Sequence, residues 1–160
     1  MVTLKTTDLS DYHPETQACQ IQFRTRGRRH AFHGQIRTVK CFEDNALLKR
    51  VVSQPARGGV LVVDGGGSLG CALIGDIIAD LAVKNGWAGA VIYGAIRDVL
   101  AIDQLDFGVK ALGSSPKRSG KTGAGQLDVP VSFGGVTFVP GHWLYSDEDG
   151  ILVSEKQLVT

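Results

Sequence analysis

Two adjacent charged residues, Arg97 and Asp98, come shortly after the apolar segment VIYG. An arginine guanidinium can bind a carboxylate through two parallel hydrogen bonds and can direct donors at a developing oxyanion. The VIYG segment is predicted to be a strand, and open α/β sheets bind ligands beyond the carboxyl ends of their strands. The pair is therefore a candidate substrate-binding site, although an Arg and an Asp side by side on a loop are also often an exposed ion pair.

A glycine-rich segment, VVDGGGSLG, places Gly65, Gly67 and Gly70 in the spacing G-x-G-x-x-G after the apolar run 60–63. Between a strand and a helix this spacing is typical of dinucleotide binding, with an acidic residue about 20 residues further on. The next predicted strand ends instead in the uncharged sequence YGA, which disfavours a NAD or S-adenosylmethionine site. The favoured interpretation is that a tight turn requires these glycines. A third interpretation is a helix N-terminus that binds an anion such as a substrate carboxylate.

Two further motifs give weaker evidence of a functional site. GKTGAG, residues 120–125, is similar to a phosphate-binding loop, but the required first glycine falls on Ser115 and Pro116 removes a backbone donor, so a mobile polar loop is predicted. The basic cluster RTRGRRH, residues 24–30, lacks the interleaved aromatic residues of an RNA-stacking surface. It is expected to be a solvated or subunit-facing loop.

The composition and the lack of long apolar segments predict a soluble, cytoplasmic protein. Its 160 residues, 43% of them hydrophobic, predict a single domain over residues 1–160. A net charge of +1 gives no field that would favour a nucleic acid or an anionic membrane as partner. Cys19, Cys41 and Cys71 lack C-x-x-C spacing, and the histidines lack ligand spacing, so neither a disulfide framework nor a zinc site is expected. No apolar run suggests a signal peptide or a membrane span.

The elements that must position Arg97 and Asp98 are clearest in the middle of the chain. Two apolar strands flank an amphipathic helix whose apolar face is expected to hold Leu73, Ile77, Ile78, Leu81 and Ala82, so residues 60–94 predict a βαβ unit with a parallel pair. Gly134-Gly135 predicts a hairpin turn within a mainly β segment, 107–154. The predicted helices are 7–12, with Thr7 or Ser10 as cap, 46–52, 71–85 and 99–105, and the predicted strands include 18–23, 33–42, 60–63 and 88–94.

Three segments together resemble the RraA-like family: VVDGGGSLGCALIGDIIADLA, VIYGAIRD and VSFGGVTFVPGHWLYSDEDGILVS. The resemblance extends from CFEDNALL to DGILVS. The family includes the regulator of ribonuclease E activity and divalent-metal 4-hydroxy-4-methyl-2-oxoglutarate aldolases. Some relatives have been called menaquinone-pathway methyltransferases, a name that the glycine motif would encourage. The resemblance implies a single α/β domain of the swivelling β/β/α type that assembles as a homotrimer or a hexamer.

The aldolase members carry an acidic residue, twenty intervening residues and then Arg-Asp. Here Asp76 is followed by residues 77–96 and by Arg97-Asp98, which matches every defined position. The resemblance implies that Asp98 binds Mg²⁺ or Mn²⁺, that Arg97 binds the substrate, and that Asp76 orients a water as base. The substrate contacts that it implies are Gly75, Asp76, Ile77, Ile78 and Arg97.

The implied activities are aldol cleavage of 4-hydroxy-4-methyl-2-oxoglutarate and decarboxylation of oxaloacetate. In both, the electrons of the broken C–C bond collect on the C2 carbonyl oxygen as pyruvate enolate, so both need an electron sink. A divalent cation is such a Lewis acid, and Arg97 can add donors. Hard Mg²⁺ often takes only one or two protein carboxylates, which agrees with Asp98 lacking histidine partners. The alternative is a non-catalytic regulator that binds ribonuclease E; the complete acidic pattern favours the enzyme.

Overall fold

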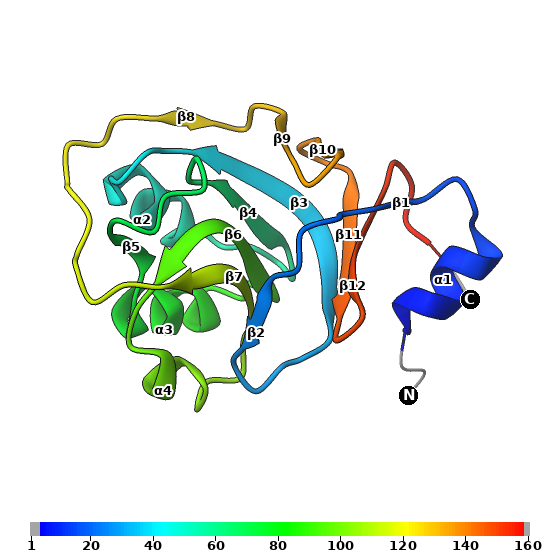
Figure 1. Cartoon of the computed structure of the whole chain (residues 1–160), viewed down its shortest axis with the longest axis horizontal. Helices are drawn as coiled ribbons and strands as arrows, with labels where there is room; N and C mark the ends of the chain where they lie inside the picture. The colour runs from blue at the N-terminus through cyan, green and yellow to red at the C-terminus, as the bar shows by residue number, and fades with distance from the viewer. Residues whose placement is uncertain (1–3, 159–160) are drawn as a thin grey trace.

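The structure, a computed structural model, describes residues 4–158 and is built around one strongly curved sheet (Figure 1). Ten strands join this sheet in the order β1-β12-β11-β3-β4-β6-β7-β2, with β5 paired to β6 and β8 paired to β3. The helices are α1 (Thr6–Tyr12), α2 (Ala46–Val52), α3 (Asp76–Lys84) and α4 (Val99–Ile102). The strands are β1 (Gln17–Ala18), β2 (Arg24–Arg26), β3 (Phe32–Lys40), β4 (Val60–Asp64), β5 (Ala72–Ile74), β6 (Gly89–Ile96), β7 (Gly108–Ser114), β8 (Gln126–Leu127), β9 (Val131–Phe133), β10 (Val136–Phe138), β11 (Trp143–Asp147) and β12 (Gly150–Ser154).

The centre of the sheet is parallel: β3 pairs β4, β4 pairs β6 and β6 pairs β7. Strands β4 and β6 are apolar along most of their length because both faces of the sheet are covered. Side chains of α2 and α3 pack on one face in the largest core cluster, and the separate β9–β10 hairpin packs on the other. The predicted α/β fold class and the predicted βαβ unit, β4-α3-β6, are confirmed.

The C-terminal part is mainly β, as predicted. Gly134 and Gly135 join β9 to β10 with φ angles of 63° and 79°, and a turn with two positive φ angles is the one that matches the twist of a short hairpin. Helix α2 has the predicted bounds. Helix α4 is three residues shorter than predicted, and α1 begins after Lys5 without a side-chain cap, so the predicted caps at its start are wrong.

The predicted helix 71–85 is wrong in its first five residues. Residues Ala72–Ile74 form strand β5, which is buried and pairs with β6, and α3 begins only at Asp76. A short apolar run fits a buried strand as well as a helix turn, so periodicity does not separate the two. Leu73 therefore lies on a strand, and Ile77 is 73% exposed instead of lying on the buried face; Ile78 and Ala82 are buried as predicted.

The basic segment 24–30 is not a loop throughout. Its first residues form β2, which covers the edge of β7 in antiparallel pairing, and its arginines are partly neutralised: Arg26 Nη1 lies 2.8 Å from Asp103 and Arg29 Nη2 lies 3.0 Å from Asp106. The predicted strand 18–23 is wrong except at Ala18, the second residue of β1; the next strand, β2, begins only at Arg24. Along the described part of the chain, no helix is long and apolar enough to cross a membrane.

Candidate active site

The parallel pairing of β5 with β6 brings the predicted site residues together. Each strand ends at the same edge of the sheet, where β5 continues into Gly75 and Asp76 and β6 continues into Arg97 and Asp98. The backbone N–H of Asp76 donates a hydrogen bond of 3.2 Å to Asp98 Oδ2. Residues separated by 22 positions thus meet at the edge where α/β sheets bind ligands.

Asp98 occupies an unusual backbone conformation. Its φ and ψ angles of 56° and 43° lie in the left-handed region, which a non-glycine residue adopts at some cost in energy, although Asp tolerates it better than most residues. Asp98 is the N-cap residue of α4, yet its side chain makes no capping hydrogen bond and lies instead against Gly75 and the start of α3. The turn therefore directs the carboxylate into the site.

Arg97 is held at its backbone and at one end of its guanidinium. Its N–H donates to Ile74 O at 2.9 Å, and Nη1 donates to Pro116 O at 3.4 Å. Nε lies 4.0 Å from Asp98 Oδ2, a loose ion pair between two side chains that are each about two-fifths exposed. Such a pair contributes little to stability. Most of the guanidinium donors stay available for a ligand.

All of the predicted site residues line one pocket of about 240 Å³. Asp76 and Ile77 are exposed at the start of α3, whereas the side chain of Ile78 is 6% exposed and packs in the core. Ile78 therefore borders the pocket with a side chain that belongs to the core. The predicted residues in the lining are Gly75, Asp76, Ile77, Ile78, Arg97 and Asp98.

The other side of this pocket comes from segments that were not predicted to belong to the site, including Lys121 of the GKTGAG motif, which was interpreted as a mobile polar loop. The loop 118–121 contributes Arg118, Ser119 and Lys121, and the start of α2 contributes Asn45 and Lys49. The lining thus includes several cationic side chains beside the carboxylates of Asp76 and Asp98, a balance that suits an anionic ligand. The loop is tied to β5, because Ala72 N–H donates to Lys117 O at 2.7 Å and Ser119 Oγ donates to Ala72 O at 2.6 Å.

The donors around Asp98 fit a hydrated Mg²⁺ or Mn²⁺ ion. Asp98 is 42% exposed at its side chain, and its Oδ2 accepts a backbone hydrogen bond. Within residues 4–158 no cluster of three or more His, Cys, Asp or Glu side chains could hold a metal by itself. Magnesium commonly keeps several waters and takes one or two carboxylates, whereas a structural zinc site would need four closely placed ligands.

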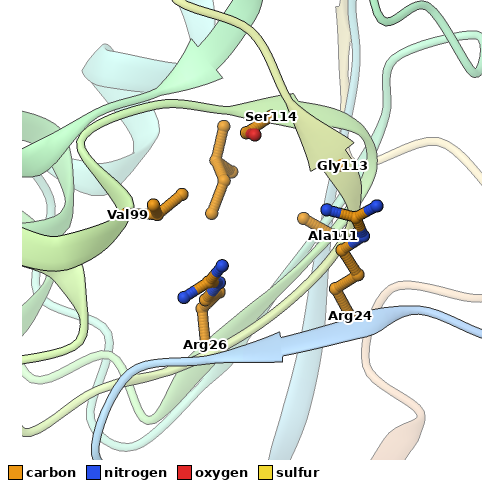
Figure 2. Close-up of a pocket in the computed structure, with 7 residues that line it drawn as sticks. Arg24, Arg26, Val99, Ala111, Gly113 and Ser114 are labelled. Atoms are coloured by element: carbon orange, nitrogen blue, oxygen red, sulfur yellow. The ribbon is translucent and has the colours of Figure 1, made fainter.

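Another hollow, lined by Ile96 and Val99 on either side of Arg97 and Asp98 in the chain, is far smaller. It lies between Ile96 and Val99 on one side and Arg24 and Arg26 on the other, and its volume is about 10 Å³. Figure 2 shows both arginine side chains extending from β2 towards it. A volume of this size holds about one water molecule. The pocket of about 240 Å³ is the candidate active site because it gathers the predicted site residues, not because of its size.

Comparison with known proteins supports a specific family. The model of the RraA-like family, described as Aldolase/RraA, matches residues 6–153. The RNA-processing inhibitor RraA from Thermus thermophilis is 44% identical, with 99% of this chain and 96% of that chain covered and a TM-score of 0.96.

Two further solved structures are similar. A Geobacillus kaustophilus HTA426 protein described as S-adenosylmethionine: 2-dimethylmenaquinone methyltransferase is also 44% identical, with 97% of each chain covered and a TM-score of 0.95. An unusual member of the RNase ES inhibitor RraA protein family from Streptomyces coelicolor is 26% identical, with 94% and 80% covered and a TM-score of 0.76.

Proposed function

Because the chain belongs to the RraA-like family, we propose that it is a metal-dependent 4-hydroxy-4-methyl-2-oxoglutarate aldolase that also decarboxylates oxaloacetate. The observation that carries this proposal is the meeting of Asp76, Arg97 and Asp98 in one cation-rich pocket at the carboxyl edge of the sheet. The substrates are small keto acids with two carboxylates, which suit a pocket lined by lysine and arginine. The products include pyruvate.

Arg97 would bind the keto-acid end of the substrate. Its remaining N–H groups can donate to the C1 carboxylate and to the C2 oxygen, where negative charge develops as the carbon–carbon bond breaks. The hydrogen bond to Pro116 O and the loose pair with Asp98 keep the guanidinium at the pocket. This interaction grows stronger as negative charge develops on the C2 oxygen. It therefore lowers the activation barrier of bond cleavage and does not act on KM alone.

Asp98 would hold the divalent cation, Mg²⁺ or Mn²⁺, together with water and substrate oxygens. When bound, the ion supplies a Lewis acid for the carbonyl. The left-handed turn at Asp98 and the absence of a Cβ atom at Gly75 leave the carboxylate room to face the pocket.

Asp76 would serve the aldol reaction in particular. Its carboxylate is exposed at the first turn of α3, and it can orient a water that takes the proton of the C4 hydroxyl group. Decarboxylation has no such proton to remove. The two reactions therefore place different demands on this residue.

The proposal includes assembly as a homotrimer or hexamer. Ile77 on α3 and Leu100 on α4 are 73% and 77% exposed, and the two helices contact each other beside the pocket. Large apolar side chains at such a position are suited to burial against another subunit. Residues of that subunit would then complete the site.

The glycine motif gives little support to a methyltransferase, the activity named for the Geobacillus relative. Gly66 and Gly67 have positive φ angles and form a tight turn, and the chain then enters β5 instead of a helix. The strand–turn–helix arrangement of a dinucleotide-binding motif is therefore interrupted. Titration calorimetry with S-adenosylmethionine and NAD should detect no tight binding.

A second candidate function is regulation of ribonuclease E, because the Thermus relative is named an RNA-processing inhibitor. This role would require a protein-binding surface and no turnover. A coupled pyruvate assay on oxaloacetate separates the two, run with Mg²⁺, with EDTA, and on Arg97→Ala. The control is Arg50→Ala, which changes an exposed arginine of α2 outside the pocket.

If the protein is an enzyme, we expect it to turn over oxaloacetate with Mg²⁺ and to lose this activity with EDTA. Arg97→Ala should lower turnover by about 10²- to 10³-fold, whereas Arg50→Ala should stay active. Absence of turnover of both keto acids by the wild-type protein would favour the regulator.

A further inference from the structure

Asp44, two residues before the first residue of helix α2, is a buried carboxylate that receives four hydrogen bonds. Its side chain lies outside the pocket lining, and the residue is 5% exposed. Oδ2 accepts from Thr122 N–H at 2.6 Å and from Thr122 Oγ1–H at 2.8 Å, and Oδ1 accepts from Gly123 N–H at 3.0 Å and Ala46 N–H at 3.3 Å. Three of the four donors thus belong to the loop that carries one side of the candidate active site.

The residue before Thr122 is the pocket residue Lys121. Its Nζ donates to Asn45 Oδ1 at 2.8 Å, and Asn45 Nδ2 donates to Leu73 O at 3.0 Å, so a chain of hydrogen bonds runs from the lysine to strand β5. The backbones of the two segments also pair: Asn45 N–H donates to Gly120 O at 3.2 Å. Lys121 is therefore fixed at its ammonium group and, through Thr122, at its backbone.

We propose that Asp44 is a positioning residue of the active site: by holding Thr122 and Gly123 it keeps the ammonium group of Lys121 in the pocket that contains Arg97. The consequence for catalysis rests on the proposed keto-acid lyase function. Asp44 itself does not line the pocket, so it acts through the loop and not by contact with substrate.

The chemistry of the contact explains why an aspartate is needed. Two carboxylate oxygens can accept all four donors, whereas the amide of an asparagine would turn N–H groups towards one pair of them. Residues 117–120 are held by backbone pairing with β5 and with the segment before α2, whereas Gly123 and Gly125 permit many backbone conformations, so the hydrogen bonds of Asp44 are what fix the turn after Lys121. Lysine loses considerable side-chain entropy when it is ordered, and a loop ordered in advance lowers this cost of binding.

The test compares Asp44→Asn with the wild-type protein on oxaloacetate. We expect KM to rise about tenfold while kcat changes less than about twofold, because the binding geometry is lost and Arg97 and Asp98 stay in place. Asp147→Asn is a closely matched control. Asp147 also accepts both the N–H and the Oγ1–H of a threonine, Thr6, at 2.8 and 2.7 Å, but it holds helix α1. Its KM should stay near that of the wild-type protein.

A double-mutant cycle with Lys121→Met shows whether Asp44 acts through the lysine. In the Lys121→Met background, Asp44→Asn should change KM by less than about twofold, since the group that it positions is gone. A full tenfold effect in that background, or an unchanged KM in Asp44→Asn alone, would overturn the proposal. If Asp44→Asn does not fold, Thr122→Val removes one of the four hydrogen bonds and is expected to raise KM by a smaller factor.

Amide hydrogen exchange gives a readout that does not need turnover. Protection at residues 120–123 should fall in Asp44→Asn and stay unchanged in Asp147→Asn. If the wild-type protein turns over no keto acid, the lyase function fails, and exchange then decides the positioning role alone. Unchanged protection in a folded Asp44→Asn protein would exclude it.

Discussion

The carboxylate of Asp98 occupies the space beside Gly75 that a methyl side chain would need. A Cβ atom placed on Gly75 would lie 2.7 Å from Asp98 Oδ2 and 3.4 Å from Arg97 Cγ. The φ angle of Gly75 is −120°, which any residue can adopt, so the backbone does not require glycine here. The site requires it, because only glycine lets α3 begin this close to the carboxylate.

Gly75→Ala should therefore lower the activity of the protein strongly while changing its stability little. The closest obstacle is the end of a side chain, which can rotate away, so the melting temperature should change by only a few degrees. Rotation of Asp98 should nevertheless lower kcat/KM for oxaloacetate by at least about tenfold and weaken Mg²⁺ binding measured by calorimetry. Gly113→Ala is the control, since its new methyl group meets only Leu69, at 3.5 Å. A fully active Gly75→Ala protein would argue against a metal at Asp98.

Asp76 should matter more for aldol cleavage than for decarboxylation. Asp76→Ala removes the carboxylate that would orient the base water, but its backbone N–H can still donate to Asp98. We expect the rate of aldol cleavage to fall by about 10²-fold or more and that of oxaloacetate decarboxylation by about tenfold or less. Asp80→Ala, one turn later on α3 and paired with Lys84, is the control. Equal losses in both reactions would contradict the assigned role.

Arg97 and Asp98 could be predicted from the residues because the rule that selects them is topological, whereas Gly75, Asp76, Ile77 and Ile78 were predicted only from the resemblance to the RraA-like family. The apolar runs 60–63 and 88–94 predict buried parallel strands, and the residues after such strands face ligands. Arg97 and Asp98 therefore stood out from the sequence, and the structure places them as that rule expects. Ile77 was misplaced because the expected helix included strand β5, which shifted the apparent apolar face.

The other half of the site could not be predicted in this way. Lys121 reaches the pocket because residue 120 pairs with Asp44, a contact between segments 76 residues apart in the chain. Polar loop residues carry no periodic pattern, and the Pro, Gly and Ser content of 114–126 argued only against regular structure. The signal that could have been used was Asp44 itself, since an aspartate before a helix often accepts backbone hydrogen bonds.

The contribution of Asp44 to stability should disappear in acid. The backbone N–H of Thr122 is the largest cause that lowers the pKa of Asp44, and together with the hydrogen bonds from Thr122 Oγ1, Gly123 and Ala46 it outweighs burial and brings this pKa from 3.8 to about 2. A carboxyl with a lowered pKa in the folded state stabilises that state above its unfolded pKa and loses this effect as pH falls through its folded pKa. In urea unfolding at about pH 6, the free energy of unfolding should be much larger for the wild-type protein than for Asp44→Asn. This difference in free energy should become smaller between about pH 4 and pH 2. A gap independent of pH would mean that the charge is not involved.

The cysteine thiols of the folded protein should be almost unreactive. Cys19, Cys41 and Cys71 are all buried. Burial is the largest cause that raises the pKa of Cys41 to about 12, and the negative charges of Asp44 and Asp64 contribute to this shift. Burial also raises the pKa of Cys19, although a backbone hydrogen bond from Ile21 lowers it in part. Because the thiolate is the reactive form, Cys41 and Cys19 should react with Ellman's reagent at about pH 8 at least about a hundredfold more slowly than in guanidinium chloride. Peptide mass spectrometry after a short iodoacetamide pulse assigns each thiol, and rapid labelling of native Cys41 would show that the end of β3 opens readily.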